Sequence, residues 1–434
     1  MRWLQFRVFL CAFLMLPLSG CAGVSATDAA DFAVAAGYTA AVYEGKTDKG
    51  AAFLACGTGG RLDRIYGDGS VENIPLPVGE KHLTSLLHDE KTTLAAGLSG
   101  ALVFRQTGGA FQQAEGAGRE HILGLAAFNG GYYAATFSGK ILFSANGSAW
   151  RQAAKPSDKP LTAIAADETR LIAVTTDSDI YKSVDGAAWT SQNYNDTYKG
   201  LAVPQTFHKI INLEETFMIL GNPLETPGVP SLMLSYDGGE TFSFSALREI
   251  NARPPEEFYP ITVNAVQYYA GELLAACDKG RVLTFTDCPT CNLIMDADAF
   301  ADLRAMAIFE DMLLLAGDGF HFELMDAGKL RQNNIAPEQA LIEIDYGATV
   351  IDVRTAEEYA AEHIPGSLHI PADEIAARLA QTVPDQTGVI LFYCVSGKKS
   401  QAALETALQL GYQNAFNLGG LSDWPYETEK SDGE

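Results

Sequence analysis

The fold is decided by a pattern that first appears in Phe53–Ile65, FLACGTGGRLDRI, and returns in Leu94–Gln106, LAAGLSGALVFRQ. In both stretches an apolar strand ends in small residues, a glycine-containing turn follows, and a second apolar strand leaves the turn. Five related stretches begin further along the chain, at Tyr133, Ile172, Met218, Leu274 and Leu314. The chain therefore holds seven similar segments between about residues 35 and 332.

The spacing of these segments indicates the architecture. The small residue before each turn serves as a marker, and Cys56 lies 40 residues before Ala96, which lies 39 residues before Ala135. An additional apolar strand precedes each marker strand, so each unit has three clear strands and a fourth is inferred. A period near 40 with several short strands per unit is typical of a β-propeller blade. We predict an all-β, seven-bladed propeller over residues 35–332.

Three segments carry a short motif in a turn. Ser235–Phe242 reads SYDGGETF, and weaker copies are Ser183–Gly186 with Trp189 and Ser144–Gly147 with Trp150. In such a hairpin the Asp or Asn bonds the turn backbone, glycine takes the positive φ angle, and the aromatic ring packs inward. The motifs resemble the Asp-boxes of BNR-repeat, sialidase-type and photosystem-assembly-factor-like propellers, where they are structural. No Arg-Ile-Pro motif of sialidases occurs in residues 22–120, so we expect a binding platform rather than a glycosidase.

The first residues predict export. Arg2 and Arg7 precede an apolar run, Val8–Leu18, that is too short to span a bilayer. Leu18-Ser19-Gly20-Cys21 resembles a bacterial lipoprotein box, which implies cleavage before Cys21, lipid on that cysteine and a tether over residues 21–34. The expected location is the cell envelope, on a membrane facing the periplasm or exterior. Ala22, rather than Asp, favours the outer membrane where two membranes are present.

Charge excludes one class of partner. Removal of residues 1–20 leaves 28 basic and 54 acidic residues, a net charge of −26. Such a surface argues against nucleic-acid binding and against adhesion to anionic lipid through basic patches. We expect contact with the membrane through the lipid anchor alone.

Five cysteines remain after Cys11 and Cys21 are set aside. Cys288 and Cys291 form a CxxC pair, for which a local disulfide is favoured, with a redox pair or half of a zinc site as alternatives. Cys56 lies in the first repeat and its counterpart in the sixth, Cys277, is not in a neighbouring blade, so these two are not paired in our interpretation. No metal centre or cofactor is predicted.

After residue 332 the pattern changes to alternating strands and helices, which is typical of a small α/β domain. Expected strands are Thr349–Val353 and Val389–Tyr393, and expected helices are Ala356–Glu362, Ile375–Ala380 and Ser400–Leu410. The last helix should bury one face, formed by Ala403, Leu404, Ala407 and Leu408, and end at Gly411.

The motifs of this domain resemble the rhodanese family in order and spacing. They are VIDVRTAEEYAAEHIPGSLHIP, FYCVSGKKSQAALETALQLGY and LGGLSDW, within a domain assigned to residues 333–428, with an acidic tail over residues 429–434. The resemblance implies that Cys394, after the central strand, is the nucleophile that carries sulfur. Its loop matches the C-x-x-G-x-R pattern of the family except at Lys399, where arginine is usual. Phosphatases of the same fold place arginine one position later, where this chain has Ser400.

The residue types of the loop suit an anion site. Val395, Ser396, Gly397, Lys398 and Lys399 wrap a helix amino terminus, where inward amide groups and the helix dipole favour negative charge. The same field, with the two lysines, is expected to lower the thiol pKa, and the thiolate is the attacking species.

Other residues are predicted to support the loop. Asp352 and Arg354 match the D-x-R pair of the family and are interpreted as scaffolding, with Ser400 at the start of the helix. His363 is interpreted as structural.

The resulting hypothesis is an exported, lipid-anchored sulfurtransferase without a cofactor. Sulfane sulfur moves from thiosulfate or a persulfide to a thiophilic acceptor through Cys394, while the propeller binds an unidentified protein partner. The alternative is a non-catalytic scaffold or assembly lipoprotein whose rhodanese module only binds partners.

Overall fold

The computed structural model describes residues 35–199, 204–213, 216–224, 231–246, 248–249, 261–269, 272–285, 290–296, 302–327, 335, 337–412 and 414–430. The chain divides into two compact units, the first made of Met1–Arg248 and Tyr259–Asp326 and the second of Glu249–Phe258 and Ala327–Glu434. Within the described residues, no helix is both long enough and apolar enough to cross a membrane.

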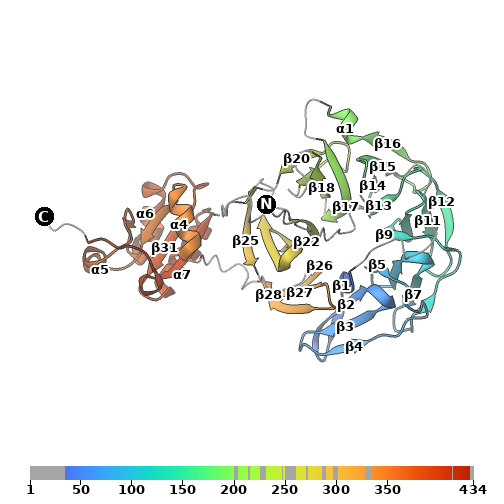
Figure 1. Ribbon diagram of the computed structural model, residues 1–434, viewed down its shortest axis with the longest axis horizontal. Helices are drawn as coiled ribbons and strands as arrows, with labels where there is room; N and C mark the ends of the chain where they lie inside the picture. The colour runs from blue at the N-terminus through green and yellow to red at the C-terminus, as the bar shows by residue number, and fades with distance from the viewer. Residues whose placement is uncertain are drawn as a thin grey trace, which may run out of the picture. The chain divides into compact units, whose positions relative to one another are not determined.

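The first unit consists of seven antiparallel sheets arranged in a ring (Figure 1). The first four sheets contain β1 (Tyr38–Thr47), β2 (Gly50–Gly57), β3 (Leu62–Tyr66) and β4 (Val71–Asn73); β5 (Leu83–His88), β6 (Thr92–Gly97), β7 (Leu102–Gln106) and β8 (Gln112–Gln113); β9 (Ile122–Phe128), β10 (Gly131–Thr136), β11 (Ile141–Ser144) and β12 (Arg151–Ala154); and β13 (Leu161–Ala166), β14 (Leu171–Thr175), β15 (Asp179–Ser183) and β16 (Thr190–Asn193).

The last three sheets contain β17 (Gln205–Leu213), β18 (Thr216–Pro223), β19 (Ser231–Ser235) and β20 (Ser243–Ala246); β22 (Val263–Tyr269), β23 (Glu272–Cys277), β24 (Arg281–Phe285) and β25 (Thr290–Asp296), with β21 (Arg248–Glu249) added at the edge; and β26 (Leu303–Phe309), β27 (Met312–Gly317) and β28 (Phe322–Asp326). A short helix, α1 (Tyr194–Thr197), follows β16. Short 3-10 turns connect the second and third strands of three sheets, at Thr58–Gly60, Leu98–Gly100 and Asp278–Gly280. The predicted seven-bladed propeller is confirmed.

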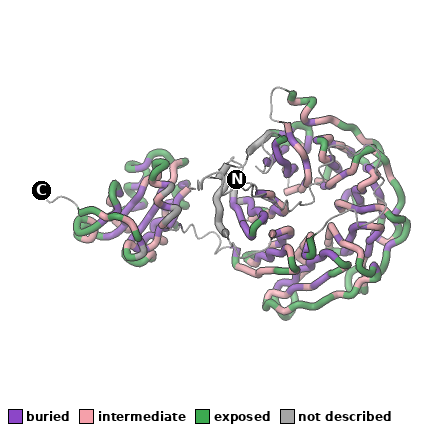
Figure 2. The backbone as a smooth tube through the Cα atoms, viewed as in Figure 1, coloured by how far each residue is buried: buried purple, intermediate pink, exposed green. Residues whose placement is uncertain are grey.

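The inferred fourth strand is present in six of the sheets, and three strands are described in the seventh. The ring closes where β1 packs against β26. There Tyr38, Phe53 and Leu314 share one apolar core, a bridge pairs Gly37 with Asp318, and the amide of Gly319 donates to the carbonyl of Ala36 over 2.6 Å. Burial is continuous along the second strands of the blades, as Figure 2 shows, because both of their faces meet other blades.

The motif turns join the third and fourth strands of their blades. In the turn after β19, both carboxylate oxygens of Asp237 accept from the amide of Thr241, over 2.9 and 3.0 Å, and the Ser235 hydroxyl donates to the same carboxylate. Gly239 holds a φ of 86° and Phe242 is buried. The turn backbone is thus stabilised by its own acidic side chain.

The second unit is a four-stranded parallel sheet in the order β30-β29-β31-β32, covered by helices. Its elements are α4 (Pro337–Asp345), β29 (Thr349–Asp352), α5 (Ala356–Ala361), β30 (Leu368–His369), α6 (Ile375–Thr382), β31 (Ile390–Cys394), α7 (Lys398–Gln409) and β32 (Ala415–Gly420), with single 3-10 turns at Ala372–Glu374 and Leu421–Asp423. One core lies between the sheet and α6 and α7, and another includes Ala340 of α4 and Trp424. Alternating residues of β31 enter the two cores, which explains its unbroken apolar run.

Two local predictions for this unit were wrong, and one helix was missed. The last helix begins at Lys398 instead of Ser400, because Gly397, at a φ of 83°, turns the chain into it directly. Leu408 is 39% exposed, and the buried face consists of Ser400, Ala403, Leu404 and Ala407. Helix α4 was not predicted, although Pro337 is a residue type that commonly opens helices.

Candidate active site

Cys394 is the last residue of β31, the strand between β29 and β32. It is 2% exposed, and its register partner on β32 is Gly420. Because the carboxyl ends of parallel strands meet at one edge of a sheet, the thiol lies where a ligand can reach strand ends and a helix amino terminus together.

The loop after Cys394 follows a backbone path that needs glycine at two places. Gly397 has a φ of 83° and serves as the residue before α7. The loop rests on the end of β32, where a Cβ atom on Gly420 would stand 2.4 Å from the carbonyl oxygen of Val395. Close packing of two backbones therefore fixes the loop above the strand.

The environment of the thiol favours its charged form. Burial by itself raises the pKa of Cys394, and hydrogen bonds from the Ser400 hydroxyl and from the amides of Ser400, Ser396 and Lys399 outweigh it, so the pKa lies below the ordinary value. These donors stabilise a thiolate, as an anion cradle at a helix amino terminus does. The site is built to hold negative charge at the sulfur.

The Ser400 hydroxyl is shared among three acceptors. It lies 3.5 Å from the sulfur of Cys394 and 2.6 Å from Oδ1 of Asn417, with the carbonyl of Gly419 at 3.4 Å. A hydroxyl carries a single proton, so Asn417 competes with the sulfur for it. Ser400 is completely buried, and its rotation is limited to these partners.

The exposed rim of the site is basic and apolar. Lys398, Lys399 and Ser396 are exposed, and Val395 is 53% exposed. The largest contributions that lower the thiol pKa come from amide and hydroxyl donors. Within the described residues the Ser396 hydroxyl forms no hydrogen bond, and Ser396 acts through its amide.

Asp352 and Arg354 form a buried ion pair at the end of β29. The guanidinium Nη2 lies 2.6 Å from Oδ2 of Asp352, and the Arg354 amide donates to Oδ1 over 2.8 Å. Hydrogen bonding to Asp352 keeps the pKa of Arg354 raised despite its burial. The guanidinium also stands 5.5 Å from the ring centroid of Tyr393, the residue before Cys394. The pair contacts the strand behind the thiol and does not contact the sulfur.

His363 lies away from the sulfur. Its Nδ1 is 2.8 Å from the carbonyl of Tyr359, and its Nε2 is 3.3 Å from a carboxylate oxygen of Glu429. Backbone bonds of 2.8 Å in both directions also join His363 to Glu429. These contacts hold the end of the chain against α5.

The other predicted cysteines are not brought to this site. Cys21, Cys288 and the side chain of Cys291 lie outside the described residues. Cys56 and Cys277 are buried in the second strands of the first and sixth blades, and burial raises the pKa of Cys56 to about 12. Among the described residues, no cluster of three or more His, Cys, Asp or Glu side chains could hold a metal ion.

The sequence analysis assigned no role to Asn417, Gly419 or Gly420. Asn417 contacts Ser400, and its amide nitrogen lies 3.3 Å from the carbonyl of Gly397. Gly419 has a φ of 92°. Two glycines at the end of a buried strand were the available signal, since such a pair marks a close backbone approach.

Comparisons with known proteins give relatives of the second unit by sequence. Residues 336–426 match the model of the rhodanese-like domain. A thiosulfate sulfurtransferase of Escherichia coli, PspE, is 41% identical over 73 residues, which cover 17% of this chain and 70% of that protein. A thiosulfate sulfurtransferase of Pseudomonas aeruginosa, GlpE, is 36% identical over 103 residues, covering 23% of this chain and 92% of that protein. The solved WD40 β-propeller domain of Doa1 covers 67% of this chain and 92% of its own, with 8% identity and a TM-score of 0.49.

Proposed function

Because the chain belongs to the rhodanese family through residues 336–426, we propose that it is an exported, lipid-anchored sulfurtransferase that carries sulfur on Cys394. The observation that carries this proposal is the thiol of Cys394, which faces amide donors at the start of α7 and has a lowered pKa. A thiolate in an anion cradle suits attack on a negatively charged sulfur donor.

In the first step the Cys394 thiolate attacks the outer sulfur of thiosulfate. A sulfur–sulfur bond forms, the bond between the outer sulfur and the sulfonate breaks, and sulfite leaves with its electron pair. The negative charge now resides on the outer sulfur of a Cys394 persulfide. The amides of Ser396, Lys399 and Ser400 that stabilise the thiolate are positioned to stabilise this anion as well.

In the second step a nucleophilic acceptor, such as cyanide or a thiolate, attacks the outer sulfur of the persulfide. The bond to Cys394 breaks and the thiolate is regenerated, so no external oxidant or reductant is consumed. Since Cys394 is 2% exposed, the acceptor must present a slender nucleophile past the rim of Val395 and Lys399.

Lys399 bears on the choice of donor. It supplies a flexible point charge where the family usually has a planar guanidinium, so the oxyanion of thiosulfate is held by fewer directed bonds. We include a persulfide as an alternative donor for this reason.

The lipid anchor and the location in the cell envelope rest on Arg2, Arg7 and the stretch Leu18–Cys21. Stable anchoring needs more than one acyl chain, which modification of both the Cys21 thiol and the new amino terminus supplies. We assign the propeller to partner binding rather than to a second activity because its motif turns have a structural role and no acid, base or metal constellation recurs in its repeats.

The test is the release of thiocyanate from thiosulfate and cyanide by the full-length protein. The Cys394→Ala variant is expected to lose the activity, and Cys56→Ala, which removes a buried propeller thiol, is expected to retain it. A folded protein with a reduced Cys394 that shows no turnover with thiosulfate or a persulfide donor would overturn the proposal. That result would favour the alternative, a scaffold whose rhodanese module only binds partners.

A further inference from the structure

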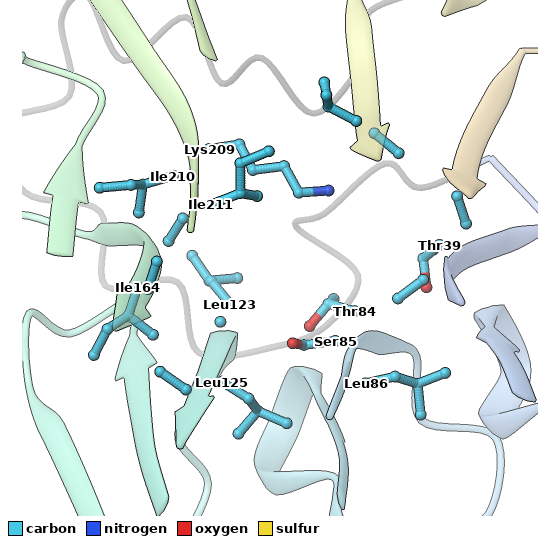
Figure 3. A pocket seen from close by; sticks show the side chains of 18 of the residues that line it. Thr39, Thr84, Ser85, Leu86, Leu123, Leu125, Ile164, Lys209, Ile210 and Ile211 are labelled. Carbon is cyan, nitrogen blue, oxygen red and sulfur yellow. The ribbon is translucent and has the colours of Figure 1, made fainter. Parts of the chain in front are cut away.

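A cavity of about 510 Å³ occupies the middle of the propeller (Figure 3). The first strand of every blade contributes to its wall: β1, β5, β9, β13, β17, β22 and β26. The surface of the wall is mainly polar, and the partly exposed side chains of Leu123, Leu125 and Ile211, labelled in Figure 3, add aliphatic contacts to it. This volume is within the range of small-molecule sites.

Each of the seven inner strands has a register irregularity against the second strand of its blade, near the marker residue of the repeat. In every blade, the residue directly after the bulge pairs with the marker residue of the second strand. These residues therefore occupy equivalent positions in the seven blades. The seven equivalent residues are Ala40, Ser85, Gly124, Ala163, Lys209, Ala265 and Ala305. All seven line the cavity. Six blades therefore place a small residue at this position, and one places a lysine.

Some polar side chains at the bulges form hydrogen bonds between neighbouring blades of the ring. The Thr39 hydroxyl donates to the carbonyl of Leu83 over 2.8 Å, and the Thr84 hydroxyl donates to the carbonyl of Ile122 over 2.7 Å. In each case a side chain of one blade bonds the inner strand of the next. These polar groups are used in closing the ring, and they do not by themselves indicate a ligand.

Lys209 differs in its charge. Its Nζ donates to the carbonyl of Asn264 over 2.9 Å, and in the described part of the chain it forms no ion pair. No aspartate or glutamate is among the residues that line the cavity. The other strong base in the wall, Arg304, is neutralised by Asp318, with its Nε 2.9 Å from Oδ1. The charge of Lys209 is thus left without a counterion in a protein with a net charge of −24.

Burial lowers the pKa of Lys209 to about 8, since an ammonium group removed from water favours loss of its proton unless an anion compensates it. One donor position of the ammonium is used by Asn264, which leaves two. The hydroxyl of Ser85, in the equivalent position of the second blade, has no hydrogen-bond partner among the described residues and is also directed into the cavity in Figure 3.

We propose that the central cavity of the propeller binds a small aliphatic carboxylate, with Lys209 as the group that receives the carboxylate. The partly exposed side chains of Leu123, Leu125 and Ile211 offer contacts to the hydrocarbon part, which inorganic anions such as thiosulfate lack. The site is independent of Cys394 and would persist if the sulfurtransferase proposal failed.

The experiment is calorimetric titration of the full-length protein with butanoate at pH 7. We expect saturable binding at one site, and at least a tenfold loss of affinity in both Lys209→Ala and Lys209→Met. Lys209→Ala should fold, because four other blades carry alanine at this position and the remaining two carry serine and glycine. The control is Lys155→Ala, an exposed lysine outside the cavity, for which affinity should stay within twofold.

The affinity is also expected to fall between pH 7 and 9, as Lys209 loses its proton. Two other bases line the cavity, His208 and Arg304. Burial lowers the pKa of His208 to about 4, so its ring stays neutral in this window, and Arg304 is paired with Asp318. The absence of saturable binding, equal affinity in wild type and Lys209→Ala, or tighter binding of thiosulfate than of butanoate would each overturn the proposal.

Discussion

The replacement Ser400→Ala tests how the site activates its thiol. It removes the hydroxyl that lies 3.5 Å from the sulfur of Cys394 and leaves every backbone amide in place. A hydrogen bond to a charged group contributes about 1.5–3 kcal/mol. The Ser400 hydroxyl lies 3.5 Å from the sulfur and also bonds Asn417 over 2.6 Å, so we take the lower end of this energy range. About 1.4 kcal/mol corresponds to a tenfold change in the thiolate population.

The rate of alkylation of Cys394 should change by a smaller factor than the thiolate population. A thiolate of higher pKa is intrinsically more nucleophilic, with a Brønsted coefficient of about 0.4–0.5, so about half of the logarithmic loss is recovered. Alkylation of Cys394 by iodoacetamide, at a pH below the thiol pKa, should therefore slow by about threefold. The midpoint of the pH–rate profile should move upward.

Ser396→Ala is the matched control, because Ser396 reaches the sulfur through its amide and that amide survives the change. Its profile should coincide with that of the wild type. If Ser400→Ala and Ser396→Ala give the same midpoint as the wild type, the Ser400 hydroxyl does not tune the thiol and the reasoning is refuted.

Further predictions concern the donor, the scaffold and the propeller. Lys399→Arg should lower the KM for thiosulfate severalfold with little change in kcat, because a guanidinium can grip an oxyanion with two bonds; an unchanged KM in steady-state assays contradicts this. Asp352→Ala leaves the buried Arg354 without its partner and should destabilise the second unit by about 3–5 kcal/mol in urea unfolding, whereas a change below about 1 kcal/mol would show that the charge is solvated. Hydrogen bonds from the turn outweigh the effect of burial and lower the pKa of Asp237 to about 2, so its carboxylate stabilises the fold above about pH 4 and this contribution is lost as the pH falls toward 2. Asp237→Ala should accordingly lower the thermal midpoint at pH 7 but not at pH 2, with thiocyanate release unaffected.

Much of the propeller could be predicted because its marker residues recur at a nearly constant spacing in the sequence. The residue before each turn, such as Cys56 or Ala96, is small because it lies on a second strand that is buried between neighbouring blades. The bulge in each inner strand has no such signal, since it depends on pairing between two strands. The equivalence of Lys209 with Ala40 could therefore be recognised only from the register.

The rhodanese-like domain was located correctly by its motifs, but the electrostatics of the loop after Cys394 required coordinates. Lys398 and Lys399 suggest a charge effect in sequence, whereas the structure directs amides at the sulfur and leaves both lysine side chains exposed. Asn417 lies 17 residues from Ser400 in sequence and contacts it across the sheet edge, a pairing that no local pattern encodes.

The most direct test of the central claim is mass spectrometry of the reduced protein after incubation with thiosulfate. Transfer through a persulfide predicts a mass gain of one sulfur atom on the peptide that contains Cys394, removal of that gain by cyanide, and no gain in Cys394→Ala. A folded protein with a free Cys394 thiol that gains no sulfur from thiosulfate or from a persulfide donor would contradict it.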